Sequence, residues 1–348
     1  MEVEWARATS NEANVFMLSG QKKKADPCDA YSQLVAKQLQ VDGESRGRRI
    51  VNLREGVPTT EPAPQPKRIC RVGKSAVKVL DAPELKNDYY LNLLDWSSED
   101  ILLILLGHTS YMYTPAAITA LDTWEDGYLC SVASLPGSPV AAIGGSNGLV
   151  RVYDQARGRP IRQFEGHGAR VSSLAFAGNL LFSGGKDGLV HGYDLRQEHC
   201  KIMTLQGHQG EVCGLKADQT QLASGSNDNR LIIWDVRQQT YRHAIHAHRA
   251  AVKALAFCPW QRNLLVSGGG SSDMQIKFWN TDSGELAGQA ETDSQVCSLL
   301  WCQHERRLLS SHGYVRNHLS LWDVSHAGRV LHLAMNPQGT MVCSASAD

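Results

Sequence analysis

The chain has 348 residues, of which 42% are hydrophobic, and its 35 Lys and Arg residues balance its 35 Asp and Glu residues. This balance excludes a strong overall field that would gather nucleic acid or hold a membrane surface. The first ten residues contain no apolar signal core, and the apolar run from Ile101 to Leu106 is too short to cross a bilayer. Nine cysteines, an odd number without a Cys-x-x-Cys pair, are typical of a reducing compartment, so we expect the protein in the nucleus and cytoplasm.

Residues 1–76 differ in composition from the rest of the chain. They are polar, contain several prolines and show no hydrophobic period, which predicts a disordered regulatory tail. Two short apolar stretches stand out, NVFMLSG at Asn14–Gly20 and AYSQLVAKQL at Ala30–Leu39. Each could become ordered on a partner, or could stay disordered or form a loose helix.

Residues 77–348 are organised by a repeat of strand-sized segments. The string GHQGEVCGLKADQTQLASGSNDNRLIIWD, which ends at Asp235, opens with Gly-His and closes with Trp-Asp. The closing positions of successive repeats are 40, 41, 45 and 43 residues apart, at Asp154, Asp194, Asp235, Asn280 and Asp323. A period in the low forties with this punctuation is typical of WD-repeat blades, so we predict an all-β propeller.

The repeat also predicts where the blades begin and end. Val77–Leu80 should be a strand, and Tyr89–Asp95 should be the first strand of blade one. The link from Asp323 to Arg329 looks too short for a fourth strand in blade six, and the last blade begins at Arg329 and stops at Asp348. We therefore predict six recognisable blades and an incomplete last one.

A buried hydrogen-bonded network is expected in blades three and four. The histidine of the loop that leads into a blade can bridge the Asp of a tight turn and a Ser of the second strand, above an aromatic residue six positions after the Asp. An unmet polar group in such a buried position costs about 1–3 kcal/mol, so one network in each blade would stabilise the fold. The two sets are His167, Ser183, Asp187 and Tyr193 in blade three, and His208, Ser224, Asp228 and Trp234 in blade four.

Three patterns suggest other chemistry but are better explained structurally. Ser224, His208 and Asp228 have the residue types of a hydrolase triad, yet the set repeats and no Gly-x-Ser-x-Gly elbow accompanies it, so we predict no enzyme. Cys297, Cys302 and His304 lack a second ligand pair at metal spacing, which favours buried cysteines over a metal site. GGSNG and SGGGSSD join strands and open no helix, so they are interpreted as turns that need positive φ rather than phosphate loops. No cofactor is predicted.

Several strings are more specific than a generic WD repeat. LDAPELKNDYYLNLLDWS, AVKALAFCPWQRNLL, SSHGYVRNHLSLW and RVLHLAMNPQG resemble the Fizzy family of activators of the anaphase-promoting complex, a ubiquitin ligase. The resemblance runs from about Val77 to the end and implies a seven-bladed propeller. In the tail, EANVFMLSGQ is similar to the motif with which the mitotic branch binds a spindle-checkpoint protein, which implies that role for Val15, Phe16, Met17 and Leu18.

The resemblance also implies binding sites for two degrons, the short sequences that mark substrates. A Lys-Glu-Asn degron would contact the face that carries the leading loops, where a carboxylate suits its Lys, an Arg its Glu and an amide its Asn. The matching positions are Asp88, Tyr89, Asn227, Ser271, Arg316 and Arg329, and Arg316 stands where the family usually has Gln. An Arg-x-x-Leu degron would lie between blades one and seven, with Asp81 and Glu84 near its Arg end.

These resemblances imply a substrate-recognition and activator subunit whose partners are ligase subunits, degron-bearing cell-cycle proteins and checkpoint proteins. The sequence departs from the family at two ligase contacts. The docking box Asp-Arg-aromatic-Ile-Pro-x-Arg does not occur, and Ala347-Asp348 stands where Ile-Arg is usual. The departures favour the alternative of an adaptor or decoy that binds degrons or checkpoint proteins without activating the ligase.

Overall fold

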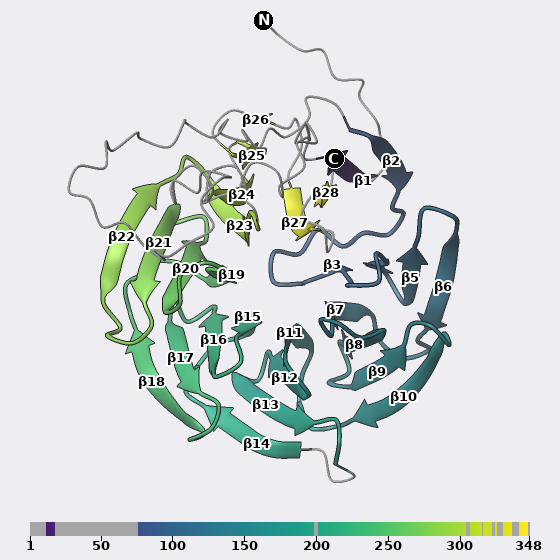
Figure 1. Ribbon diagram of the computed structural model, residues 1–348, viewed down its shortest axis with the longest axis horizontal. Helices are drawn as coiled ribbons and strands as arrows, with labels where there is room; N and C mark the ends of the chain where they lie inside the picture. The colour runs from purple at the N-terminus through teal and green to yellow at the C-terminus, as the bar shows by residue number, and fades with distance from the viewer. Residues whose placement is uncertain are drawn as a thin grey trace, which may run out of the picture. The chain divides into compact units, whose positions relative to one another are not determined.

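The computed structural model describes residues 12–17, 76–197, 201–303, 307–314, 316–321, 324–325, 330–335 and 341–346. Strands and turns make up these residues, and none of them belongs to a helix that could cross a membrane. The strands form four-stranded antiparallel sheets that stand as blades around an axis (Figure 1). The fold is an all-β WD-repeat propeller, as the repeat predicts.

Six blades are each built from four consecutive strands, with the first strand innermost. Blades one to three comprise β3 (Leu94–Trp96), β4 (Leu102–Leu106), β5 (Thr109–Tyr113) and β6 (Ile118–Thr123); β7 (Leu129–Ser134), β8 (Val140–Gly145), β9 (Val150–Asp154) and β10 (Arg159–Phe164); and β11 (Val171–Ala177), β12 (Leu180–Gly185), β13 (Leu189–Asp194) and β14 (Lys201–Gln206). Blades four to six comprise β15 (Val212–Ala217), β16 (Gln221–Ser226), β17 (Leu231–Asp235) and β18 (Thr240–Ile245); β19 (Val252–Phe257), β20 (Leu264–Gly269), β21 (Gln275–Asn280) and β22 (Leu286–Glu291); and β23 (Gln295–Trp301), β24 (Leu308–Gly313), β25 (His318–Ser320) and β26 (Val324–Ser325).

A further four-stranded sheet combines the two ends of the chain in the order β2-β1-β28-β27. Its strands are β1 (Glu12–Met17), β2 (Lys78–Asp81), β27 (Val330–Met335) and β28 (Met341–Ser346). β27 contacts β23 of blade six and β3 of blade one, so the innermost strands form a closed circle. The prediction that the last blade is incomplete is therefore wrong, because β1 and β2 from the start of the chain add two strands to β27 and β28.

β1 lies within residues 1–76, which the sequence predicts to be largely unpaired, and it is a paired segment of that region. Its six residues pair with β28 along their whole length, from Glu12 opposite Ser346 to Met17 opposite Met341, and with β2 on the other side. The predicted strand at Val77–Leu80 corresponds to β2. Apart from Ala76, the remaining residues of the predicted tail, Ala30–Leu39 among them, lie outside the described residues.

Two strand predictions are wrong in detail. Residues 89–93 do not form the first strand of blade one, which begins at Leu94, because they cross the inner ends of other blades instead. Blade six does have a fourth strand, since two residues suffice for β26 to pair with β25. The short link after Asp323 limits the length of this strand without removing it.

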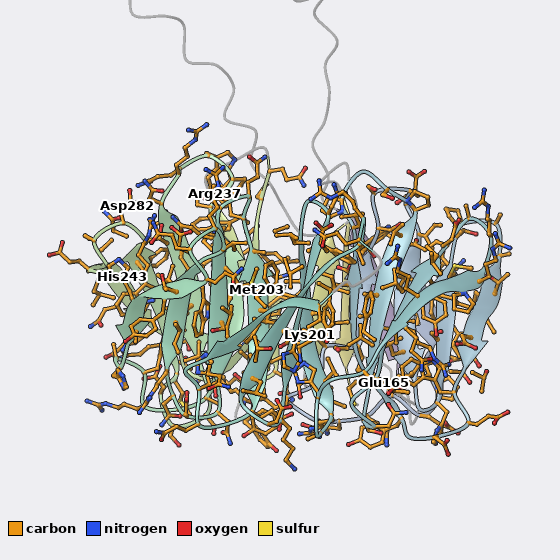
Figure 2. All side chains as sticks on the ribbon, turned by 90° about the horizontal axis from the view of Figure 1, so that it is seen from below. Glu165, Lys201, Met203, Arg237, His243 and Asp282 are labelled. Carbon is orange, nitrogen blue, oxygen red and sulfur yellow. The ribbon has the colours of Figure 1, made fainter. Side chains whose placement is uncertain are left out.

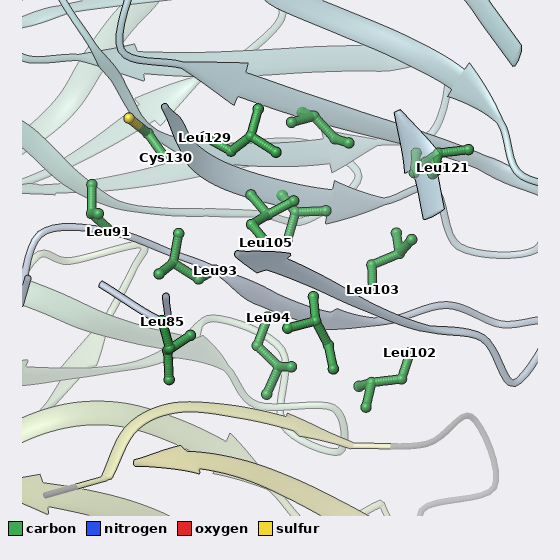
Figure 3. Close-up of a cluster of buried hydrophobic side chains, with 14 of the residues drawn as sticks. Leu85, Leu91, Leu93, Leu94, Leu102, Leu103, Leu105, Leu121, Leu129 and Cys130 are labelled. Atoms are coloured by element: carbon green, nitrogen blue, oxygen red, sulfur yellow. The ribbon is translucent and has the colours of Figure 1, made fainter. Parts of the chain in front are cut away.

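The hydrophobic core lies between neighbouring blades. The cluster in Figure 3 joins Leu102, Leu103 and Leu105 of β4 to Leu129 of β7, together with Leu93 from the segment before β3. Comparable clusters join blades two and three, three and four, four and five, and five and six. Blade packing therefore fixes the positions of the loops at each end of the strands.

The two ends of the strands form two faces. Arg237 and Asp282, in turns that link third and fourth strands, lie at one face, whereas Glu165, which precedes the loop into blade three, lies at the other (Figure 2). We call the second one the histidine face, because it carries the histidines of the leading loops and the turns that link second and third strands. Gly148 (φ 81°), one of the glycines expected in these turns, does adopt positive φ.

Candidate functional site

A hydrogen-bonded network fixes the histidine face in blade four. Nδ1 of His208 lies 3.2 Å from Asp228 Oδ2, and its Nε2 lies 2.7 Å from Ser224 Oγ. Trp234 Nε1 donates to the same Oγ (2.7 Å), and the Gln209 amide donates to Asp228 (2.8 Å). Burial raises the pKa of Asp228, but the hydrogen bonds from His208 and Gln209 outweigh burial and bring it to about 2. The carboxylate thus ties its own turn to the leading loop.

The network of blade three uses the same groups with a different aromatic residue. His167 lies 3.0 Å from Asp187 Oδ2 through Nδ1 and 2.8 Å from Ser183 Oγ through Nε2. Tyr193 replaces the tryptophan and stacks on Phe164, with ring centroids 4.5 Å apart. Hydrogen bonds therefore join all four residues singled out in blade four, and His167, Ser183 and Asp187 of the four in blade three.

Blades five and six show a third network and a variation. In blade five, His248 lies 2.6 Å from both Asp273 Oδ2 and Ser267 Oγ. The Gly-His pattern does not identify this histidine, because Ala247 precedes it. In blade six, His312 of the second strand lies 2.7 Å from Ser310 Oγ, and burial lowers its pKa to about 4.

The triad-like set of blade four is not arranged for catalysis. Ser224 is fully buried, and its Oγ already accepts the indole donor of Trp234. A catalytic serine needs an exposed Oγ and donors aimed at the reacting oxygen. Because the same geometry recurs in blades three and five, the network is structural.

One cluster of potential metal ligands adjoins the blade-three network. Donor atoms of His167, Asp187 and His191 lie within 4.8 Å of one another. The nitrogens of His191 face Gly166 O (3.0 Å) and Thr204 Oγ1 (3.1 Å), and Lys201 Nζ lies 3.4 Å from Nε2. A neighbouring ammonium and fully engaged nitrogens favour a hydrogen-bonded extension of the network over a cation site.

The centre of the histidine face is formed by residues 88–93, which we call the axial segment. It runs in from β2 toward the axis before the chain turns out into β3 (Figure 1). Asn92 Nδ2 donates to Ser172 O (2.7 Å) and Cys213 O (2.9 Å), and Leu91 O accepts from Lys253 Nζ (2.8 Å). The axial segment is thus anchored to blades three, four and five.

The two adjacent tyrosines of the axial segment have different surroundings. Tyr89, a predicted degron contact, is only 8% exposed, and its hydroxyl donates to Val296 O (3.1 Å). Tyr90 is half-buried, and its hydroxyl donates to Asn227 Oδ1 (2.9 Å). Its backbone amide donates to Asp88 Oδ1 (2.9 Å). Tyr90, which the sequence did not single out, therefore joins two of the predicted degron contacts.

An arginine and a glutamate lie beside Asp88. Arg170 makes two parallel hydrogen bonds to Glu211, Nε to Oε1 (2.6 Å) and Nη2 to Oε2 (2.9 Å). Its Nη1 donates to Asp88 Oδ2 (2.8 Å) and lies 3.4 Å from Tyr128 Oη. Ser172 Oγ also donates to Glu211. Arg170 and Glu211 each stand three residues after a network histidine, His167 and His208, and this spacing is the signal that could have revealed them.

The other predicted degron contacts are less tightly joined. Ser271 is exposed in the turn between β20 and β21, and Arg316 lies in the corresponding turn of blade six. Arg316 Nη1 donates to Asp293 Oδ2 (2.9 Å), with both side chains about 70% exposed. Arg329 lies outside the described residues.

Asp81 and Glu84, the positions implied for the second degron, lie at the end of β2 and in the segment between β2 and β3. Asp81 is the last residue of β2 and is exposed. Glu84 has positive φ (63°), and its carboxylate lies against Gly107, between β4 and β5. Of the predicted checkpoint contacts, Val15, Phe16 and Met17 belong to β1, whereas Leu18 lies outside the described residues.

Comparisons with known proteins agree on one family. The sequence model of the CDC20/Fizzy WD40 domain matches residues 80–348. The chain is 41% identical over 301 residues to "Cell division cycle 20.1, cofactor of APC complex" of Arabidopsis thaliana, covering 80% of this chain and 66% of that protein. It is 40% identical to "Anaphase-promoting complex subunit cdc20" of Dictyostelium discoideum over 301 residues, covering 81% of this chain and 60% of the relative.

A solved structure shows the same fold. A chain of "Crystal Structure of Mitotic Checkpoint Complex" superimposes with a TM-score of 0.76 at 37% identity, and the match covers 84% of this chain and 96% of that one. The chain spans between 60% and 66% of the length of the two relatives.

Proposed function

Because this chain belongs to the CDC20/Fizzy family of WD40 proteins, we propose that its propeller is a degron-binding activator subunit of the anaphase-promoting complex. The observation that carries this proposal is the joining of Asp88 and Asn227 on the histidine face through Tyr90. The two relatives are named as a cofactor and a subunit of that complex, which supports the ligase as the partner. Members of the family act as adaptor-type activators, and this chain is not an enzyme.

The geometry suits the lysine and asparagine of a Lys-Glu-Asn degron. Asp88 keeps about a third of its side chain exposed, at 32%, and offers a carboxylate to an ammonium group. Asn227 is exposed beside it and offers an amide to the asparagine. Arg329 supplies the positive charge for the glutamate in this proposal, on the basis of the family resemblance. An exposed ion pair contributes about 0.2–1 kcal/mol, so binding is weak and falls with salt.

Titration of a labelled Lys-Glu-Asn peptide by fluorescence anisotropy tests the site. Arg329→Glu should abolish binding, because repulsion replaces attraction at the peptide glutamate. Arg237→Glu is the matched control, since it makes the same charge change on the opposite face and should bind as the wild type does (Figure 2). Equal affinity of Arg329→Glu and wild type would refute the assignment.

A ubiquitination assay separates the activator from the adaptor or decoy. The activator increases ubiquitination of a degron-bearing substrate by the purified ligase, and Arg329→Glu reduces this increase. An adaptor or decoy binds the peptide equally well and leaves the ligase inactive. That outcome would reject activation while keeping the degron site.

We further propose that the sheet β2-β1-β28-β27 serves as the seventh blade, with Asp81 and Glu84 at the Arg-x-x-Leu degron beside blade one. In the same proposal, Val15, Phe16, Met17 and Leu18 bind a checkpoint protein by adding a strand to it. β1 is paired on both sides, so this binding requires β1 to leave the sheet. A disulfide that locks β1 to β28 tests this requirement.

A further inference from the structure

Arg170 connects three segments of the histidine face that are far apart in sequence. It stands in the loop that leads into blade three, Glu211 stands in the loop into blade four, and Asp88 begins the axial segment. The side chains of Arg170 and Glu211 are 15% and 6% exposed, compared with 32% for Asp88. Only the aspartate is thus well placed to meet a ligand, while the other two lie beneath it.

The charges of the buried pair largely cancel. Glu211 takes two parallel hydrogen bonds from the guanidinium, so Arg170 and Glu211 together act as a dipole at Asp88 rather than as a full charge. Lys86 Nζ lies 4.1 Å above the ring of Tyr128, whose hydroxyl lies 3.4 Å from Arg170 Nη1. The pair therefore alters the charge of the surface little, and its main effect on Asp88 is geometric.

That geometric effect follows from the donors on the two carboxylate oxygens. Tyr90 N holds Oδ1 and Arg170 Nη1 holds Oδ2, and each oxygen keeps a second lone pair. With both donors in place the carboxylate has one orientation. Without Arg170 it could rotate on a single hydrogen bond, and a ligand would then have to order it on binding, which lowers affinity.

We propose that Arg170, held by Glu211, is a positioning residue that fixes the carboxylate of Asp88 to receive the lysine of a Lys-Glu-Asn peptide. The proposal rests on the degron-binding function given above. Neither Arg170 nor Glu211 is among the degron contacts that the sequence predicts. Their effect should be specific to one residue of the peptide.

The test uses the double variant Arg170→Gln/Glu211→Gln. It removes one positive and one negative charge, so the net charge stays constant, and the two amides can still hydrogen-bond where a lone Arg170→Gln would strand Glu211. Two labelled peptides are titrated, one with Lys-Glu-Asn and one with Ala-Glu-Asn. Arg242→Gln, which breaks a surface ion pair with Asp282 near the opposite face, is the control.

The double variant should bind the lysine peptide about two- to fivefold more weakly than wild type, the range that one exposed ion pair accounts for. Its affinity for the alanine peptide should be unchanged. Lysine-peptide affinity equal to or above that of wild type would overturn the positioning role. An equal loss for both peptides would overturn it too, because it would indicate general distortion of the face.

Hydrogen exchange at the Tyr90 amide, without peptide, decides the matter even if wild type binds neither peptide and the degron function fails. Loss of Arg170 frees Asp88, so the hydrogen bond that Tyr90 N donates should open more often. Exchange at this amide should be several-fold faster in the double variant and unchanged in the control. Unchanged exchange in the double variant would refute the inference by itself.

Discussion

His208→Ala is the most direct test of the network that holds the histidine face. The histidine side chain is fully buried and makes one hydrogen bond to Asp228 and one to Ser224. After the substitution Asp228 keeps the amides of Gln209 (2.8 Å) and Arg230 (3.0 Å), and Ser224 keeps Trp234. The loss is therefore two hydrogen bonds and the packing of the ring, without a stranded charge.

Two net hydrogen bonds contribute about 2 kcal/mol, so we expect the free energy of unfolding to fall by about 1–3 kcal/mol. Urea unfolding followed by tryptophan fluorescence measures this change, because Trp234 lies in the network. His243→Ala is the control, since His243 is less buried, in β18, and makes its contact with Asp282 O (2.9 Å). A urea midpoint of His208→Ala that matches wild type would refute the stabilising role of the network.

Two further predictions concern pH and the chain-end sheet. Burial lowers the pKa of His312 to about 4 in the folded protein, below its ordinary value near 6.5, so stability should be full above about pH 6.5 and fall as the pH drops toward 4. His312→Asn should make this loss of unfolding free energy with falling pH shallower, as urea unfolding at each pH measures, and an unchanged pH dependence would contradict the prediction. Part of the loss should remain in this variant, because the pKa of His191 is also lowered to about 4. Val15→Cys should form a disulfide with Cys343, its register partner across β1 and β28, and Asn14→Cys, opposite Ser344, should not. The oxidised Val15→Cys protein, with β1 locked, should lose the checkpoint-protein binding of its reduced form, and retained binding would show that β1 need not leave the sheet.

The blades could be predicted from the sequence because their signals are local. Each blade repeats its own turn residues and strand lengths, and the spacing of six from Asp228 to Trp234 places both in one blade without knowledge of the others. The pairing of β1 with β28 has no such signal. Glu12 and Ser346 are opposite each other only because the ring returns to its start, and a six-residue strand gives no indication of a partner so distant.

The residues at the centre of the histidine face were hard to predict for a related reason. Tyr89 and Tyr90 are adjacent, and alternation along a strand would place them on opposite sides, but the axial segment is not a strand. Which ring is buried depends on Val296 and Asn227, both far along the chain. Likewise, Arg170 and Glu211 are 41 residues apart and meet only because blades three and four are neighbours.

Stability and the proposed peptide binding depend on the same loops of this face. His167 and Arg170 stand in one leading loop, and His208 and Glu211 in the next. Each loop thus carries a network histidine and one member of the buried Arg170–Glu211 pair beside Asp88. A loop fixed by its histidine cannot move its arginine or glutamate freely, and such preorganisation reduces the entropy lost on binding. Weakening a network should therefore weaken peptide binding as well as the fold, whereas Arg170→Gln/Glu211→Gln should weaken binding with little effect on the unfolding free energy. The difference between these two classes of variant follows from their contacts. The histidine bonds the second strand of its own blade, whereas Arg170 and Glu211, three positions after a histidine, bond each other, and Arg170 also bonds Asp88.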